Sequence, residues 1–214
     1  MLDLKTGARI LDIPSGYGRH SIELAARGFD VVGSELNSVH LEKAKQDAQA
    51  KNVTVNFVQE NMIDISYKNE FDTVINMFYS FGFFETDEEN EKVLQHFYEA
   101  LKPGGKFLMH TDVNIPRIVA GLYKEHEVRK LKSGAELEII DSYNTDTKRI
   151  EGSWIIKDAE GNTERKDYSV RVYTKGEFID LCKKAGFTEF AIYGDWQGSS
   201  YSDMSEDMII VATK

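Results

Sequence analysis

Strand-like and helix-like segments alternate along the first half of the chain. Short segments rich in apolar and β-branched side chains are separated by longer segments in which apolar residues recur at helical spacing. In order, the predicted elements are a strand over 9–13, a helix over 19–27, a strand over 30–35, a helix over 38–51, strands over 53–58 and 71–76, a helix over 88–101 and a strand over 106–111. Because strands that alternate with helices are typical of α/β proteins, this half predicts a doubly wound, mostly parallel sheet.

The second half of the chain has a different pattern. After a short helical piece over 116–123, the β-rich segments GAELEIIDSYN, RIEGSWIIKD and TERKDYSVRVYT are joined by the turn-like sequences TDTK and AEGN, which indicates a small antiparallel sheet. A helical pattern then returns, with Thr174 as its predicted N-cap and Gly186 at its C-cap. The strands predicted over 187–193 and 208–213 are joined only by a loop, so we expect an antiparallel hairpin, because parallel strands need a longer crossover.

These elements predict an α/β fold with a seven-stranded, mostly parallel sheet, a C-terminal antiparallel hairpin and a small antiparallel β insertion. The expected organisation is a first part of the α/β core over 1–122, the insertion over 123–173 and the final helix and hairpin of the core over 174–214. No linker is long enough to define a second independent domain.

Charge and composition limit the partners of the chain. The 214 residues carry a formal net charge of -10, which disfavours binding to nucleic acid and to acidic membrane surfaces and favours a small or neutral substrate. The basic segment KEHEVRKLK, residues 124–132, is the exception, and we interpret it as a solvated hairpin face. The chain has no long apolar run, its N-terminus lacks the pattern of a signal peptide and Cys182 is its one cysteine. A cytoplasmic protein without a membrane span is therefore expected, as a monomer or homodimer.

The stretch ILDIPSGYGRH, residues 10–20, predicts a ligand-binding loop between the first strand and the first helix. Gly16 and Gly18 allow the backbone to approach a ligand closely, and the helix N-terminus that follows offers free N–H groups. Glu35 ends the second strand, where its carboxylate can accept both hydroxyls of a ribose. A nicotinamide dinucleotide and an adenosyl cofactor explain these residues equally well.

Three features favour the adenosyl cofactor. The dinucleotide fingerprint has a third glycine where this chain has Ser21. Asp12 lies just before the loop, where it would repel a pyrophosphate but attract a cationic cofactor. A C-terminal antiparallel hairpin is unusual for a dehydrogenase. An NAD-dependent oxidoreductase therefore stays the alternative hypothesis.

Five motifs in order resemble the class I S-adenosylmethionine-dependent methyltransferases. They are ILDIPSGYGRH, VVGSEL, QENMID, FDTVINMFYSFGFF and LKPGGKFLM. The resemblance is closest to a small-molecule branch in which an antiparallel β insertion covers the active site, and it implies the Rossmann-like methyltransferase fold. It also implies transfer of a methyl group from S-adenosyl-L-methionine to an N, O or C atom of a small organic molecule. A non-catalytic cofactor-binding relative is a further alternative.

The resemblance also implies roles for residues of the cofactor site. Gly16 and Gly18 would pack against the methionine portion, Glu35 would hold the ribose, and Leu36 and Met62 would enclose the adenine. The other candidate cofactor-binding residues are Asn61, which would face the adenine amino group, Asp12, Tyr17, Arg19, His20, Asn76 and Phe78.

The chain departs from the family pattern in two places. Pro14 and Ser15 stand where the family usually has Cys or Gly, and Tyr17 stands where it has a small hydroxyl residue, so a stiffer and bulkier loop is expected. Relatives also usually begin with one or two capping helices, whereas here the first predicted strand begins at residue 9.

Three residues near the predicted strand ends are candidates for catalysis. His110 near the end of the fifth strand would serve as a general base, although a structural histidine explains it equally well. Asp112 follows it, and Tyr79 would line the cleft and stabilise the methylsulfonium by cation–π contact.

Five further residues are candidates for binding the substrate: Phe81, Tyr143, Trp154, Arg171 and Tyr173. Aromatic area with one guanidinium suits an organic molecule that carries a carboxylate or phosphate. The alternation of a half-buried sheet explains the residues of the insertion equally well. No Cys/His cluster has metal-ligand spacing, so no metal is expected.

Overall fold

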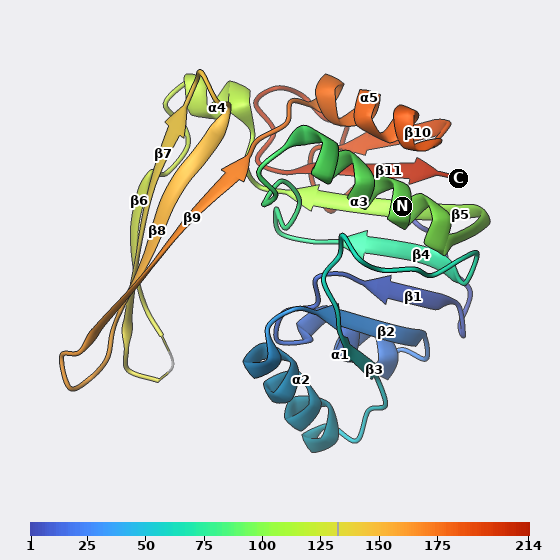
Figure 1. The fold of residues 1–214 in the computed structure, drawn as a ribbon, viewed down its shortest axis with the longest axis horizontal. Coiled ribbons are helices and arrows are strands. Elements are labelled where there is room, and N and C mark those ends of the chain that lie inside the picture. Colours follow the sequence, from blue (N-terminus) through green and yellow to red (C-terminus); the bar gives the residue numbers. More distant parts are fainter. Residues whose placement is uncertain (132) are drawn as a thin grey trace.

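The computed structural model describes residues 1–131 and 133–214, so Lys132 at the end of the basic segment lies outside the described residues. The described residues form two sheets, a seven-stranded sheet in the order β10-β11-β5-β4-β1-β2-β3 and a four-stranded sheet in the order β6-β7-β8-β9. Figure 1 shows the four-stranded sheet beside one end of the larger one. In the part of the chain that is described, no helix is both long and apolar enough to cross a membrane.

The first half of the chain forms the parallel part of the larger sheet. Its elements are β1 (Arg9–Asp12), α1 (Arg19–Ala26), β2 (Asp30–Glu35), α2 (Ser38–Ala50), β3 (Asn56–Gln59) and β4 (Phe71–Asn76). β1 pairs in parallel with β2 on one side and with β4 on the other. The strand order therefore reverses between β1 and β4.

The second half completes the larger sheet with α3 (Asp87–Ala100), β5 (Leu101–Thr111), α5 (Lys175–Ala185), β10 (Glu189–Tyr193) and β11 (Met208–Thr213). β5 is parallel to β4, whereas β11 is antiparallel to both β5 and β10, so the predicted C-terminal hairpin is confirmed. Thr174 caps α5 by accepting the Glu177 N–H, and Gly186 ends it in the left-handed conformation, as predicted.

An aromatic cluster fixes β5 in the centre of the core. The Phe107 ring of β5 lies 5.3 Å from Phe97 of α3, 6.4 Å from Phe178 of α5 and 5.8 Å from Phe187, between ring centroids. All four side chains are fully buried, and burial of large aromatic side chains dominates core energetics. On the opposite face of the sheet, a smaller cluster packs against Leu24 of α1. The end of β5 is thus held from both faces.

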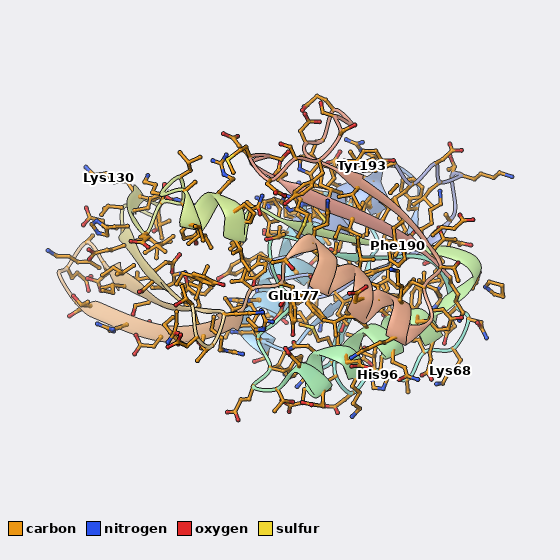
Figure 2. The ribbon with its side chains drawn as sticks, turned by 90° about the horizontal axis from the view of Figure 1, so that it is seen from above. Lys68, His96, Lys130, Glu177, Phe190 and Tyr193 are labelled. Carbon is orange, nitrogen blue, oxygen red and sulfur yellow. The ribbon has the colours of Figure 1, made fainter. Side chains whose placement is uncertain are left out.

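The second sheet is antiparallel throughout. It follows the short helix α4 (Ile115–Val119) and consists of β6 (His126–Lys130), β7 (Glu136–Asn144), β8 (Arg149–Lys157) and β9 (Thr163–Arg171). Three of these strands were expected; β6 is the fourth, formed by the described part of the basic segment, whose residues are mostly exposed. Figure 2 shows Lys130 of this sheet at one end of the molecule, far from Phe190 and Tyr193 of the core.

The four-stranded sheet is joined to the core at the loop after β4. The Arg171 N–H donates to the Gly82 carbonyl at 2.8 Å, and a Cβ at Gly82 would overlap the Arg171 backbone. A third apolar cluster, which includes Val113, Ile150 and Val170, fills the junction. One face of this sheet is thereby turned toward the carboxyl end of the larger sheet.

Candidate active site

The reversal of strand order opens a crevice at the carboxyl ends of β1 and β4. The Asn76 amide of β4 donates to the Ile13 carbonyl at 2.8 Å, and the Ile13 N–H donates to the Ile75 carbonyl at 3.0 Å. The two strands are therefore held together while the chain turns away from them in opposite directions. Ligands of open α/β sheets bind at such a point.

One cavity of about 320 Å³ lies in this crevice. Its lining includes Glu35, Leu36, Asn61 and Met62, four of the residues for which the motifs imply cofactor contacts. Leu36 is 59% exposed and Met62 is half-buried, so both side chains have apolar surface available for a planar ring. The Asn61 side-chain oxygen accepts the Ile63 N–H at 3.3 Å, which fixes the amide at the cavity wall.

Glu35 at the end of β2 links this cavity to the glycine loop. Its Oε2 accepts the Gly16 N–H and its Oε1 accepts the Asn37 N–H, both at 2.8 Å. Each carboxylate oxygen has a second lone pair for another donor, such as a ribose hydroxyl. Glu35 therefore both orders the loop and offers acceptors to a ligand.

The two loop glycines have different surroundings. Gly16 has a φ of +54°, and no atom lies within 4 Å of the position that a Cβ would occupy. A Cβ on Gly18 would lie 2.8 Å from the Phe57 ring and 2.9 Å from the Ala44 Cβ. Open space for a ligand therefore lies beside Gly16, whereas Gly18 is needed for the packing of α1 against α2 and β3.

Asp12 is fully buried beneath the loop. Ser21, which replaces the third glycine of a dinucleotide fingerprint, donates its hydroxyl to Asp12 Oδ2 at 2.5 Å. Burial raises the pKa of Asp12 to about 7, although the hydrogen bonds from Ser21 act in the opposite direction. A buried carboxyl with this pKa favours a cationic ligand near it over a phosphate.

The remaining cofactor candidates gather at the N-terminus of α1. The Arg19 guanidinium lies 4.9 Å from the centroid of the Phe78 ring, and the His20 ring stacks on the same ring at 5.5 Å. Tyr17 is exposed and its ring lies 4.3 Å from that of His40. Phe78 thus joins α1 to the loop after β4.

A second, larger cavity of about 630 Å³ lies between the carboxyl end of the main sheet and the inner face of the four-stranded sheet. Ser80 and Phe83 line both cavities, so the two adjoin at the loop after β4. Tyr79, Asp112 and Trp154 also line the larger one.

The structure corrects the expectation that His110 contacts a substrate. The side chain is 2% exposed, and among the described residues that line the larger cavity His110 is absent. Its Nδ1 accepts the Phe78 N–H at 3.3 Å, and its Nε2 lies 2.9 Å from Asp207 Oδ1. Both ring nitrogens are occupied, so any role in the reaction is exerted through Asp207 or Phe78.

The Tyr79 hydroxyl is also engaged in a hydrogen bond within the protein. Its hydroxyl donates to the Arg171 carbonyl, and burial raises its pKa well above the usual value, so the phenol stays protonated. The ring can wall the cavity, but the oxygen is not a base. Asp112, by contrast, is exposed toward the cavity.

Four of the five substrate candidates lie elsewhere. Among the described residues that line either cavity, Trp154 is present and Phe81, Tyr143, Arg171 and Tyr173 are not. Phe81 packs in the main core, 5.3 Å from Phe178 between ring centroids. Tyr143 packs against the cluster at the sheet junction.

Arg171 and Tyr173 form a polar network beside α3 and α5. The Tyr173 hydroxyl donates to Asp87 at 2.6 Å, and the Arg171 guanidinium lies 3.5 Å from Asp87 and 3.3 Å from Glu177. The guanidinium also lies 4.4 Å from the centroid of the Tyr173 ring. These residues anchor the second sheet to the core and are not free to bind a ligand.

A tyrosine pair that the sequence pattern did not single out lines the larger cavity instead. Asp141 accepts hydrogen bonds from the Tyr123 hydroxyl at 2.7 Å and from the Tyr168 hydroxyl. Gly152 is the register partner of both Asp141 and Tyr168, and a Cβ there would overlap them. A glycine inside a strand often marks such a close approach, and this signal was present in the segment RIEGSWIIKD.

In residues 1–131 and 133–214, no group of three or more His, Cys, Asp or Glu side chains is arranged to hold a metal ion.

Comparisons with known proteins indicate the class of protein. Residues 10–105 match a family described as "Methyltransferase domain". A methyltransferase of Geobacillus sp. (strain WCH70) is 27% identical over 96% of this chain and 84% of its own length. The glycine/sarcosine N-methyltransferase of Aphanothece halophytica is 27% identical over 96% of this chain and 76% of its own length. Three relatives named as RNA methyltransferases match 55% of this chain or less.

A solved structure has the same fold. The S-adenosylmethionine-dependent methyltransferase from Clostridium acetobutylicum ATCC 824 superposes with a TM-score of 0.82 at 13% identity, covering 97% of this chain and 84% of that chain. Residues 10–105 therefore match a methyltransferase domain, and the fold is that of an S-adenosylmethionine-dependent methyltransferase. The methyltransferase domain and the relatives named as methyltransferases show an enzyme that uses S-adenosylmethionine as its cofactor.

The residues of the crevice fit this cofactor. The open space beside Gly16, the carboxylate of Glu35 and the apolar surfaces of Leu36 and Met62 suit the methionine, ribose and adenine parts in turn. Buried Asp12 suits the positive charge.

We predict that Glu35→Gln weakens binding of S-adenosylhomocysteine by roughly 10- to 100-fold, because hydrogen bonds to a charged group are lost and the glycine loop loses its anchor. Isothermal titration calorimetry measures the effect. Glu42→Gln on α2 is the matched control, because among the described residues the Glu42 carboxylate accepts a hydrogen bond from Gln46 of the same helix and none from the glycine loop. An unchanged affinity in Glu35→Gln would contradict the assignment.

We also predict a pH-dependent stabilisation by Asp12→Asn. Because the folded pKa of about 7 lies above the usual 3.8, the unfolded chain ionises first as pH rises. Stability of the parent then falls by about 1.4 kcal/mol per pH unit between these values and levels off above them. The Asn side chain keeps an acceptor for Ser21 and does not ionise. The free energy of unfolding of Asp12→Asn, measured in urea, should therefore exceed that of the parent by more at pH 8 than at pH 5. Asp180→Asn on exposed α5 is the control, and an advantage independent of pH would refute the prediction.

Proposed function

We propose that the chain methylates a small organic molecule bound in the larger cavity. The observation that carries the proposal is the position of this cavity, which adjoins the cofactor crevice at Ser80 and Phe83. Its volume of about 630 Å³ lies within the usual range for small-molecule sites. The four-stranded sheet, within residues 123–173, serves in this proposal as the cover of the substrate.

The cofactor supplies an electrophilic methyl group on a positively charged sulfur. The protein then has to hold the acceptor atom in line with that group and exclude water. Phe78, Phe83 and Trp154 provide apolar walls for this purpose. The Tyr79 ring also lines the cavity, and its hydroxyl is hydrogen-bonded to the Arg171 carbonyl. The fixed tyrosine–carboxylate set of Tyr123, Asp141 and Tyr168 gives the opposite wall a rigid polar surface.

Charge supports a small molecule over a nucleic acid. The net charge of the chain is -10, and the larger cavity is lined by five carboxylates and three cationic side chains. Phosphate backbones are bound by surfaces with an excess of Lys and Arg. The relative from Aphanothece halophytica matches 96% of this chain and is named for small amino acids as substrates.

The proposal is tested with S-adenosylmethionine that carries a labelled methyl group. Incubation with a cell extract is expected to place the label in the low-molecular-mass fraction and not in RNA or protein. Trp154→Ala is expected to raise the KM for the labelled acceptor by about 10-fold, because an aromatic wall of the cavity is removed.

The matched control is Val128→Ala, on the opposite face of the four-stranded sheet from Trp154. Binding of S-adenosylhomocysteine should be equal in both variants and the parent. Label found in RNA, or equal KM values in Trp154→Ala and Val128→Ala, would overturn the proposal.

A further inference from the structure

Asp207 stands at the meeting point of β5 and β11. It directly precedes Met208, which is the register partner of Thr111, and Asp112 directly follows Thr111. Asp207 and Asp112 therefore flank the same end of one antiparallel strand pair, and both line the larger cavity. The Asp207 side chain is 24% exposed, and it lines both this cavity and a neighbouring one of about 480 Å³ beside Trp196.

His110 fixes the orientation of Asp207. Because the Phe78 N–H donates to His110 Nδ1 at 3.3 Å, the ring proton is on Nε2, which donates to Asp207 Oδ1 at 2.9 Å. This bond uses one oxygen of the carboxylate and leaves Oδ2 for a ligand in the cavity. The same imidazole packs edge-on against the Phe78 ring at 4.9 Å between centroids and lies 5.0 Å from the Trp196 ring, so it cannot turn freely.

The three cationic side chains that line the cavity each have a partner within the protein. Lys124 and Arg129 both pair with Glu127, at 3.4 Å and 2.5 Å. Arg117 donates to the Met204 carbonyl at 3.0 Å. Among the described residues, the ion pairs of Asp207 include His110 and no Lys or Arg side chain, whereas Arg129 acts electrostatically on Asp112. Asp207 is therefore the carboxylate of this cavity that is left for a cationic ligand.

We propose that the methyl acceptor is a protonatable amine, that Asp207 binds its ammonium form, and that His110 is the positioning residue of Asp207. This inference rests on the proposed function and names the substrate class for the same cavity. An ammonium group gains a charge-assisted hydrogen bond at Oδ2 and lies near the aromatic rings of the cavity. A carboxylate acceptor would be repelled by the same oxygen.

The transfer requires a neutral nitrogen. The ammonium gives one proton along its hydrogen bond to Asp207 Oδ2, from which it passes to solvent. The freed lone pair forms the new N–C bond as the C–S bond breaks, and the electron pair of that bond goes to sulfur. The positive charge thus moves from sulfur to the product nitrogen, which stays beside the carboxylate.

The test compares benzylamine with its isostere benzyl alcohol as probes, by saturation-transfer NMR titration in the presence of S-adenosylhomocysteine. The parent is expected to bind benzylamine at least about 10-fold more tightly, because only the ammonium forms a charge-assisted bond. Asp207→Asn is expected to abolish this preference and leave the affinity for benzyl alcohol unchanged. Asp203→Asn, which removes a like charge four residues away outside the cavity lining, is the control and should keep the preference.

Variants of His110 separate positioning from structural support. His110→Gln keeps a donor for Asp207 and is expected to keep most of the amine preference, whereas His110→Phe fills the same space without a donor and should lose it. If His110 only supports the fold, His110→Phe will lower the affinities for benzylamine and benzyl alcohol together and leave their ratio unchanged. That result would refute the positioning role of His110.

Equal affinity for the two probes in the parent, absence of benzylamine binding, or an amine preference that survives Asp207→Asn would each overturn the proposal. Because binding is read without turnover, these failures are distinct from failure of the proposed function, in which the labelled methyl group enters RNA or protein.

Discussion

The structure depends on the point at which the strand order reverses between β1 and β4. These strands pair in parallel, and the bond from the Asn76 amide to the Ile13 carbonyl ties their carboxyl ends together. From there the chain winds toward β3 on one side and toward β5 and β11 on the other. The loops that leave the two strands must therefore diverge, and the crevice between them is a consequence of topology before any side chain is considered.

Different residues line the two sides of this crevice. On the β2 side, the Glu35 carboxylate accepts backbone N–H groups from the glycine loop and from the turn into α2, and it keeps acceptor positions for a ligand. On the β5 side, the loop after β4 runs between the cofactor crevice and the larger cavity. The Phe78 N–H of this loop donates to His110 of β5, and the Phe78 ring packs against the Arg19 guanidinium of α1. The four-stranded sheet closes the larger cavity because its last strand is held at Gly82 in that same loop.

Much of this arrangement could be predicted from local sequence. The periodicity of apolar residues defined the order of strands and helices, and the caps at Thr174 and Gly186 follow from short-range chemistry. The motifs identified Glu35, Leu36, Asn61 and Met62, which all line one cavity, because their positions at strand ends are set by the shared topology.

The substrate side was harder to predict because it depends on tertiary contacts. Asp207 lies 97 residues from His110 along the chain, and only the antiparallel pairing of β5 with β11 brings them together. Arg171 and Tyr168 lie three residues apart in β9, on opposite faces of its sheet, so one joins a network with α5 and the other faces the cavity. Residue type alone does not distinguish those two positions.

A crystal structure of the chain with S-adenosylhomocysteine is the most direct test of the cofactor site. We expect the adenine between Leu36 and Met62, the ribose hydroxyls on Glu35, and the sulfur on the side of the larger cavity. A cofactor bound outside the crevice between β1 and β4, or one whose sulfur faces away from that cavity, would contradict this expectation.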